Sequence, residues 1–362
     1  MNTSRRRSRI RLLVPLLAAA LVAAGCGGDG DTDEGASASA SASAVADAPT
    51  AEQTTSSVEP SEATEEPAGD SAFPVTITHA LGETTIDAEP LRIISLSGPE
   101  GDALVALGIT PVGVPGTPTA PGALPTWWGD RIDPADTTLL ISDFSGVFNL
   151  EEIAALEPDL ILGAGSVLDA AAYEQYSSIA PTIPYLTEAF QDPWRDVTLM
   201  VGAAVGMPDE AAVLVADTEA AIDGLATIGL DGATYTFNVV PAPGTVISVT
   251  EPADVANQLL GELGMSIAPG VADLPRQPTT GSMISPEQLN LIDADVVMYI
   301  AVTEQAADGL LAEPTFAATP AATEGRLIRL DLDEAVALRA PGVLAIPWLF
   351  DQLEPERAAI LG

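Results

Sequence analysis

The sequence predicts an α/β protein of two lobes, each with a parallel sheet flanked by helices, joined by one long helix. Three observations predict this architecture. Strand and helix signals alternate in two separate halves of the chain, which is typical of parallel sheets with helices on both faces. Residues 194–225, between the halves, carry no strand signal, and a cap–helix–strand unit recurs at an offset of 136 residues.

The first half opens with the buried-strand pattern RIISLS, followed by a helix pattern that Gly108 ends. Asn149 is a good N-cap for a second helix, which Pro158 ends before the apolar strand DLILG. The predicted strands of this half are 92–97, 111–114, 159–163 and 182–186, and its predicted helices are 100–107, 150–156 and 173–179.

The segment between the halves has the pattern of one long helix. Pro208, Asp209 and Glu210 favour a helix start, because proline suits the first turn and acids complement the helix dipole. One helical face then carries Leu214, Thr218, Ala221, Ile222 and Leu225. Roughly 20 residues with a rise of about 1.5 Å each span about 30 Å, the width of a small lobe. We therefore expect a stiff connection.

The second half repeats the alternation. Its predicted strands are 234–240, 245–249, 295–300 and 326–330, and its predicted helices are 252–263, 286–292 and 341–353. The recurring unit has a capping residue, a glutamate two positions later, an apolar helix and an aspartate that opens a strand. The paired positions are Asn149 and Ser285, Glu151 and Glu287, and Asp159 and Asp295. One alternative is that any cap–helix–strand unit shows this pattern. The match at paired positions nevertheless favours two similar lobes.

Composition excludes several classes of function. The chain has 362 residues with a formal net charge of −39, no lysine, one histidine and one cysteine. P-loop and pyridoxal chemistry need a lysine, and zinc sites or Ser–His and Cys–His pairs need more histidine and cysteine. Nucleic-acid binding needs a basic face, which 13 arginines among 52 acids do not build. We expect no nucleic-acid partner, no cofactor and no resident metal.

The N-terminus has the pattern of an export signal. Five arginines within residues 1–11 precede an apolar run over 12–24, which is shorter than the roughly 20 residues of a membrane span. Small residues then stand directly before Cys26, the only cysteine. This pattern resembles a bacterial lipoprotein signal, cut before a lipid-modified cysteine. An ordinary secretory signal is the alternative. We expect lipidation of Cys26 and an anchor on the outer face of the cytoplasmic membrane.

The next stretch is too polar to fold alone. Residues 27–72 contain eleven acids, no arginine and no aromatic residue. The apolar surface that they could bury is too small to offset the conformational entropy lost on folding. The predicted organisation is a signal peptide (1–25), a lipid-anchored acidic linker (26–72), an N-terminal lobe (73–192), a connecting helical segment (193–228) and a C-terminal lobe (229–362).

Candidate ligand-binding residues follow from the rule that ligands bind outside the carboxyl ends of parallel strands. Trp127 and Trp128 stand in a Gly/Pro-rich loop and suit a wall that stacks on a ligand; core packing is the alternative. Phe144 and Phe148 favour core packing. The full candidate set is Ser97, Trp127, Trp128, Arg131, Phe148 and Ser166 in the first lobe, and Arg276 and Arg339 in the second.

Other basic residues are expected to be structural. An arginine in so acidic a chain is usually the partner of a carboxylate. For Arg276 and Arg339 this charge pairing is the alternative to ligand binding. His79 falls in a predicted N-terminal hairpin, where we expect a solvated or strand-pairing residue and no metal ligand.

Several blocks together resemble the substrate-binding lipoproteins of ABC transporters, and more narrowly the iron-siderophore and cobalamin binders of the helical-backbone class (the class III periplasmic-binding fold). The blocks are 90–96, 102–114, 149–162 and 179–182, with looser matches at 284–299 and 341–353. Their order and spacing carry the resemblance, which covers about 73–362. The departure is Gly98–Gly101, where relatives often carry an acid or an aromatic residue.

The resemblance implies a non-enzymatic, monomeric receptor that captures a ferric siderophore between its lobes and delivers it to an ABC permease. The iron would be bound through the chelator. The resemblance further implies that Glu151 and Glu287, one per lobe, contact arginines of the permease. Cobalamin and haem are alternative ligands. An exported hydrolase with paired carboxylates and a surface adhesin are alternatives of other classes.

Overall fold

The computed structural model describes residues 72–116, 123–142, 147–163, 169–226, 230–275 and 281–361. The chain divides into two compact units, 1–64 and 65–362, and every described residue belongs to the second. The predicted signal peptide, Cys26 and nearly all of the linker lie outside the described residues. No helix within the described ranges has the length and apolarity that crossing a membrane requires.

A hairpin opens the folded unit. Strands β1 (Val75–His79) and β2 (Gly82–Ile86) pair antiparallel, with His79 opposite Gly82. Apolar side chains of the hairpin, including that of Ile86, pack into the same cluster as α4 (Trp194–Ala204). The sequence prediction of a hairpin here is confirmed.

The first lobe is built on a five-stranded, wholly parallel sheet of order β5-β4-β3-β6-β7. Its strands are β3 (Ile93–Ser95), β4 (Gly113–Pro115), β5 (Thr138–Leu140), β6 (Leu160–Leu162) and β7 (Thr182–Ile183). Its helices are α1 (Gly98–Ala106), α2 (Leu150–Ala155) and α3 (Ala170–Ser177), with short 3₁₀ turns η1 (Thr126–Trp128) and η2 (Pro134–Asp136). Because all five strands are parallel, their carboxyl ends lie along one edge of the sheet.

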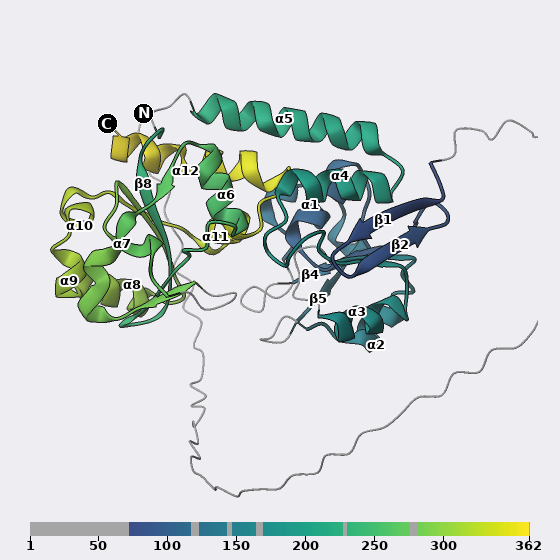
Figure 1. Ribbon diagram of the computed structural model, residues 1–362, viewed down its shortest axis with the longest axis horizontal. Helices are drawn as coiled ribbons and strands as arrows, with labels where there is room; N and C mark the ends of the chain where they lie inside the picture. The colour runs from purple at the N-terminus through teal and green to yellow at the C-terminus, as the bar shows by residue number, and fades with distance from the viewer. Residues whose placement is uncertain are drawn as a thin grey trace, which may run out of the picture. The chain divides into compact units, whose positions relative to one another are not determined.

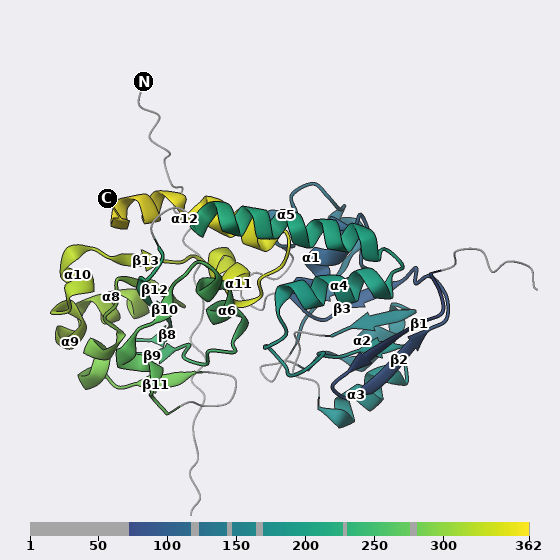
Figure 2. The same ribbon diagram turned by 45° about the horizontal axis from the view of Figure 1, so that its top comes forward.

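The connection contains two helices. Helix α5 (Pro208–Ala226) begins at the predicted proline, and α4 precedes it after a short turn. Helix α4 packs on α1 of the first lobe and on α5, and α5 also contacts α12 (Ala345–Leu361) of the second lobe. Figures 1 and 2 show α5 running beside both α4 and α12. The long connecting helix is confirmed.

The second lobe has a sheet of order β11-β9-β8-β12-β13, with β10 pairing on β8. Its strands are β8 (Thr234–Ala242), β9 (Thr245–Ser248), β10 (Ser266–Ile267), β11 (Ser282–Ile284), β12 (Val296–Ala301) and β13 (Leu327–Arg329). Its helices are α6 (Val255–Glu262), α7 (Pro269–Ala272), the 3₁₀ helix η3 (Pro286–Ile292), α8 (Glu304–Ala312), α9 (Pro314–Ala317), α10 (Pro320–Glu324), α11 (Leu332–Arg339) and α12.

The two-lobe α/β fold is confirmed, with one correction to the second sheet. Strand β9 runs antiparallel to both β8 and β11, so this sheet is mixed and not wholly parallel. Only Pro243 and Gly244 separate β8 from β9, and Gly244 has φ +74°. A two-residue loop joins antiparallel strands, whereas a parallel pair needs a crossover of a dozen residues or more.

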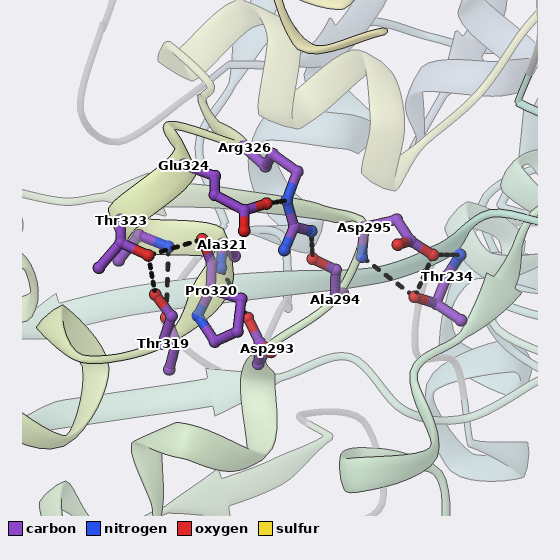
Figure 3. A network of polar contacts seen from close by, with 11 residues as sticks. Thr234, Asp293, Ala294, Asp295, Thr319, Pro320, Ala321, Thr323, Glu324 and Arg326 are labelled. Atoms are coloured by element: carbon purple, nitrogen blue, oxygen red, sulfur yellow. Dashed lines mark hydrogen bonds and ion pairs between the residues drawn. The ribbon is translucent and has the colours of Figure 1, made fainter.

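The recurring sequence unit is also a recurring structural one. Asp295, before β12, accepts hydrogen bonds from the backbone N–H and hydroxyl of Thr234 at 2.9 and 2.8 Å, which lower its pKa (Figure 3). Asp159, before β6, likewise accepts from the backbone N–H groups of Leu91 and Arg92, both at 2.8 Å. Each aspartate thus ties two neighbouring strands together at their amino ends.

The same end of the second sheet holds an arginine, as predicted for a structural residue. Arg326 pairs with Glu324 at 3.0 Å and donates to the carbonyl of Ala294, while Asp293 accepts from the backbone N–H of Ala321 at 2.8 Å (Figure 3). This polar network joins α10 to the start of β12. It therefore stabilises the amino end of the sheet.

Candidate functional site

The carboxyl edge of the first sheet brings Ser97 and Arg131 near the protein surface. Ser97 follows β3, is half-buried and donates its hydroxyl to the buried carboxylate of Glu100. Arg131 is exposed, and its Nη1 donates to the carbonyls of Trp127 and Trp128 at 3.2 and 3.3 Å. Arg131 therefore closes the η1 turn and leaves part of its guanidinium toward solvent.

The two indoles of η1 do not form a wall at the surface. Trp127 and Trp128 are 7% and 2% exposed, and each donates its Nε1–H to Oδ1 of Asp102, at 2.7 and 2.6 Å. The ring of Trp127 also lies 5.2 Å from that of Trp348 on α12. The structure thus places both indoles in core packing, the alternative that the sequence left open, because a buried acceptor is available to them.

Other candidates are packed or lie outside the described residues. Phe148 is 6% exposed and packs in the core around β3 and β6, in agreement with the core interpretation. Arg339, on α11, forms an ion pair with Asp254 at 2.8 Å, so it serves as a charge partner. Burial raises the pKa of Asp254, and the arginine opposes that shift. Phe144, Ser166 and Arg276 lie outside the described residues.

Sequence reasoning missed the polar residues that join the two lobes. Arg195 on α4 pairs with Glu262 of α6 at 2.6 and 3.0 Å and with Glu219 of α5, and it stacks on Trp194 at 4.4 Å. The side chain of Gln258 donates to the carbonyl of Gln191 at 2.9 Å. The pairs Arg195–Glu262 and Gln191–Gln258 are each separated by 67 residues, and Arg195–Glu219 by 24, so no local pattern signals them.

Asp102 is a fully buried carboxylate at this junction. It lies on α1 at 1% exposure and accepts from the backbone N–H of Ala345, at the start of α12, at 2.8 Å. Desolvation raises its pKa to about 6, although the indole and backbone donors oppose the shift. The one sequence feature that indicates a buried carboxylate here is the position of Asp102 at the start of the apolar run DALVAL.

A cavity of about 320 Å³ lies within the second lobe, between α6, β10, α7 and the β9–α6 loop. The residues that line it are Tyr235, Thr250, Pro252, Asn257, Met265, Ile267 and Ala272. The hydroxyl of Tyr235 donates to Asn257 at 2.8 Å, and burial raises the pKa of Tyr235. Since that hydroxyl is already engaged within the lobe, the cavity offers chiefly apolar contact.

Glu151 and Glu287 occupy matching, exposed positions. Glu151 lies in the first turn of α2, where Asn149 accepts its backbone N–H at 2.9 Å, and Glu287 lies in the first turn of η3. An exposed apolar side chain stands four residues before each glutamate, Val147 at 48% and Met283 at 60% exposure. Within the described residues neither glutamate forms an ion pair with an arginine.

His79 is buried and lies in β1 opposite Gly82, so of the two expected environments the structure shows the strand-pairing one and not the solvated one. Its Nε2 lies 3.0 Å from Oγ1 of Thr84, its Nδ1 accepts from the backbone N–H of Leu81 at 3.2 Å, and its ring meets Tyr173 edge-on at 5.3 Å. Across the described part of the chain, no three His, Cys, Asp or Glu side chains are grouped to hold a metal ion.

Acidification is expected to destabilise the fold through His79. Desolvation lowers its pKa below 6.5, against the opposing charge of Glu83, and a proton on Nδ1 would face the N–H of Leu81. The contribution of His79 is therefore present above about pH 6.5 and is lost as the pH falls through the lowered pKa. Chemical unfolding of the wild type and His79→Gln between about pH 7.5 and 5 tests this. The advantage of the wild type should shrink; a constant difference would contradict it.

The comparisons with known proteins agree with the fold. The sequence profile of the periplasmic binding protein family matches residues 100–334. The probable siderophore-binding lipoprotein YfiY of Bacillus subtilis (strain 168) is 28% identical over 298 residues, which cover 77% of this chain and 86% of the relative.

Two solved structures extend the match over both lobes. A periplasmic solute binding protein from Mycobacterium smegmatis has a TM-score of 0.68 at 30% identity, covering 80% of this chain and 99% of that one. PiaA of Streptococcus pneumoniae TIGR4, solved in complex with ferrichrome, has a TM-score of 0.67 at 25% identity, covering 79% and 99%.

Proposed function

Because the chain belongs to the periplasmic binding protein family, we propose that it is an extracytoplasmic receptor that captures a ferric siderophore and delivers it to an ABC permease for iron uptake. The observation that carries the proposal is the match of both lobes and their connection to PiaA, whose structure was solved with ferrichrome. YfiY, a probable siderophore-binding lipoprotein, supports the same ligand class. A receptor of this kind binds its cargo without catalysis.

The cargo is an iron chelate held between the lobes. With one histidine and one cysteine in the whole chain, we assign iron coordination to the chelator. Ser97 and Arg131 lie at the surface near the carboxyl edge of the first sheet and are retained as contacts. Ser166 and Arg276 stay in the candidate set on their sequence positions alone. Trp127, Trp128, Phe148 and Arg339 are reassigned to packing and charge pairing.

The receptor is proposed to act as a monomer tethered to the outer face of the cytoplasmic membrane. Lipidation of Cys26 would supply the anchor, and the acidic linker (26–72) would hold the folded unit clear of the membrane. The lipoprotein names of relatives support this arrangement. The permease would contact Glu151 and Glu287, whose carboxylates are exposed at equivalent places in the two lobes.

Titration of tryptophan fluorescence tests the ligand class. The four tryptophans, Trp127, Trp128, Trp194 and Trp348, all take part in the junction between the lobes or pack beside it. A chelate that binds between the lobes should therefore change their emission saturably. Ferrichrome should do so, and iron-free ferrichrome should bind more weakly. Saturable binding of cyanocobalamin or haemin, with no response to ferric chelates, would reject the proposal.

A further inference from the structure

Asp102 is a buried carboxylate surrounded by hydrogen-bond donors. Its Oδ1 accepts the indole N–H groups of Trp127 and Trp128, and its Oδ2 accepts the backbone N–H of Ala345. The backbone N–H of Leu344 is a further donor to it. No arginine pairs with it among the described residues. Among the described residues, its negative charge is therefore stabilised by hydrogen-bond dipoles and by no positive charge.

The carboxylate and its donors come from three separate places in the fold. Asp102 lies on α1, the indoles lie on η1 of the same lobe, and Ala345 opens α12 of the second lobe, 243 residues further along the chain. Trp127 also packs against Trp348 of α12. One side chain thus joins an N-terminal helix, a turn at the carboxyl edge of the first sheet and the C-terminal helix.

The backbone leaves space for this carboxylate and for little else. A Cβ on Gly342 would lie 2.5 Å from Oδ2 of Asp102, and a Cβ on Gly101 would lie 2.9 Å from the ring of Trp128. Glycine at these two positions therefore permits the close approach of α1 to the segment before α12 and to η1.

Only an all-acceptor side chain satisfies this set of donors. Asparagine has the same shape, but its amide NH₂ must face either the two indoles or the backbone N–H of Ala345. Burying a carboxylate without a countercharge is costly. An apolar side chain of similar size would avoid that cost, but it would leave the indole and backbone N–H groups buried without an acceptor, which is also costly.

We propose that Asp102 is a positioning residue that locks the Trp127–Trp128 turn of the first lobe onto the start of α12, so that the two lobes hold one setting. Arg131 depends on the same lock, because it bonds the carbonyls of both tryptophans. Affinity for a chelate bound between the lobes therefore depends on Asp102. That consequence rests on the proposed function; the lock itself does not.

The test compares Asp102→Asn with Asp159→Asn in the full mature chain. Asp159 also accepts two backbone N–H groups with its two oxygens, but it lies at the amino end of the first sheet, away from the junction. Hydrogen exchange of residues 123–132 and 342–349, measured without ligand, shows whether the η1 turn and the start of α12 are held together. Ferrichrome titration below the melting transition reports affinity.

Asp102→Asn should lose exchange protection in both segments together and bind ferrichrome about tenfold more weakly, a change of about 1.4 kcal/mol. Asp159→Asn should melt at a lower temperature with both readouts unchanged. Normal protection and affinity in Asp102→Asn, with only a lower melting temperature, would overturn the proposal.

A second variant covers the case in which Asp102→Asn does not fold. Trp127→Phe removes one N–H donor to Oδ1 and keeps an aromatic ring against Trp348. It should lose protection at 342–349, across the junction from the substitution; unchanged protection there would overturn the lock. If the wild type binds no ferric chelate, the proposed function fails, while the exchange measurement still decides the role of Asp102.

Discussion

Replacing Glu151 and Glu287 with alanine together is expected to abolish iron uptake while the purified protein binds its chelate as before. Both carboxylates are exposed, both lie in first turns, and neither forms an ion pair within the described residues. They are therefore available to arginines of a permease, one from each lobe. Uptake of radioactive iron by cells that carry only the variant measures the effect.

The competing explanation is that each glutamate only complements its helix dipole, worth about 0.3–1 kcal/mol. The neighbouring positions provide a matched control, since Glu152→Ala with Gln288→Ala changes the same two first turns. The control should keep full uptake, and both double variants should keep nearly the wild-type melting temperature. Surviving uptake in the Glu151 and Glu287 double variant, or a parallel fall in chelate affinity, would show that docking is assigned to the wrong residues.

A neutral ferric hydroxamate is expected to bind at least about tenfold more tightly than a triply anionic ferric catecholate. Residues 73–362 carry 41 acids and 8 arginines, so an anionic chelate approaches a strongly negative field. The arginines do little to reverse it. Carboxylates pair with Arg195, Arg326, Arg329 and Arg339. Arg131 is the described arginine near the carboxyl edge of the first sheet that has no such partner.

Titrations with ferrichrome and ferric enterobactin at low and physiological ionic strength separate charge from shape. Screening acts over about 8 Å at physiological salt, so the catecholate should gain affinity as salt is added and ferrichrome should not. Tighter binding of the catecholate, or a preference for ferrichrome that is independent of salt, would refute the charge argument.

The parts of the fold that local sequence governs were predictable. Pro208 with two acids marks the start of α5, and the recurring cap, glutamate and aspartate mark equivalent units in the two lobes. The antiparallel direction of β9 was also predictable, because the four residues between the predicted strands 234–240 and 245–249 are too few for the crossover that a parallel pair needs. The prediction of a wholly parallel second sheet was wrong because it extended the pattern of the first half to the second.

The missed features depend on contacts between distant residues. An indole pair in a Gly/Pro-rich loop fits a ligand wall as well as a core, and the deciding residue, Asp102, lies on another element. Arg339 is likewise explained by Asp254, 85 residues away. Such pairings arise from tertiary packing, and no periodicity or capping rule encodes them.

The most direct test of the receptor assignment is the iron content and visible absorbance of the chain purified from iron-starved cells that make it naturally. We expect one iron per chain, held in an organic chelate that mass spectrometry identifies after the protein is denatured. A corrin or haem chromophore in place of that chelate, or protein that remains iron-free and takes up no ferric chelate afterwards, would contradict it.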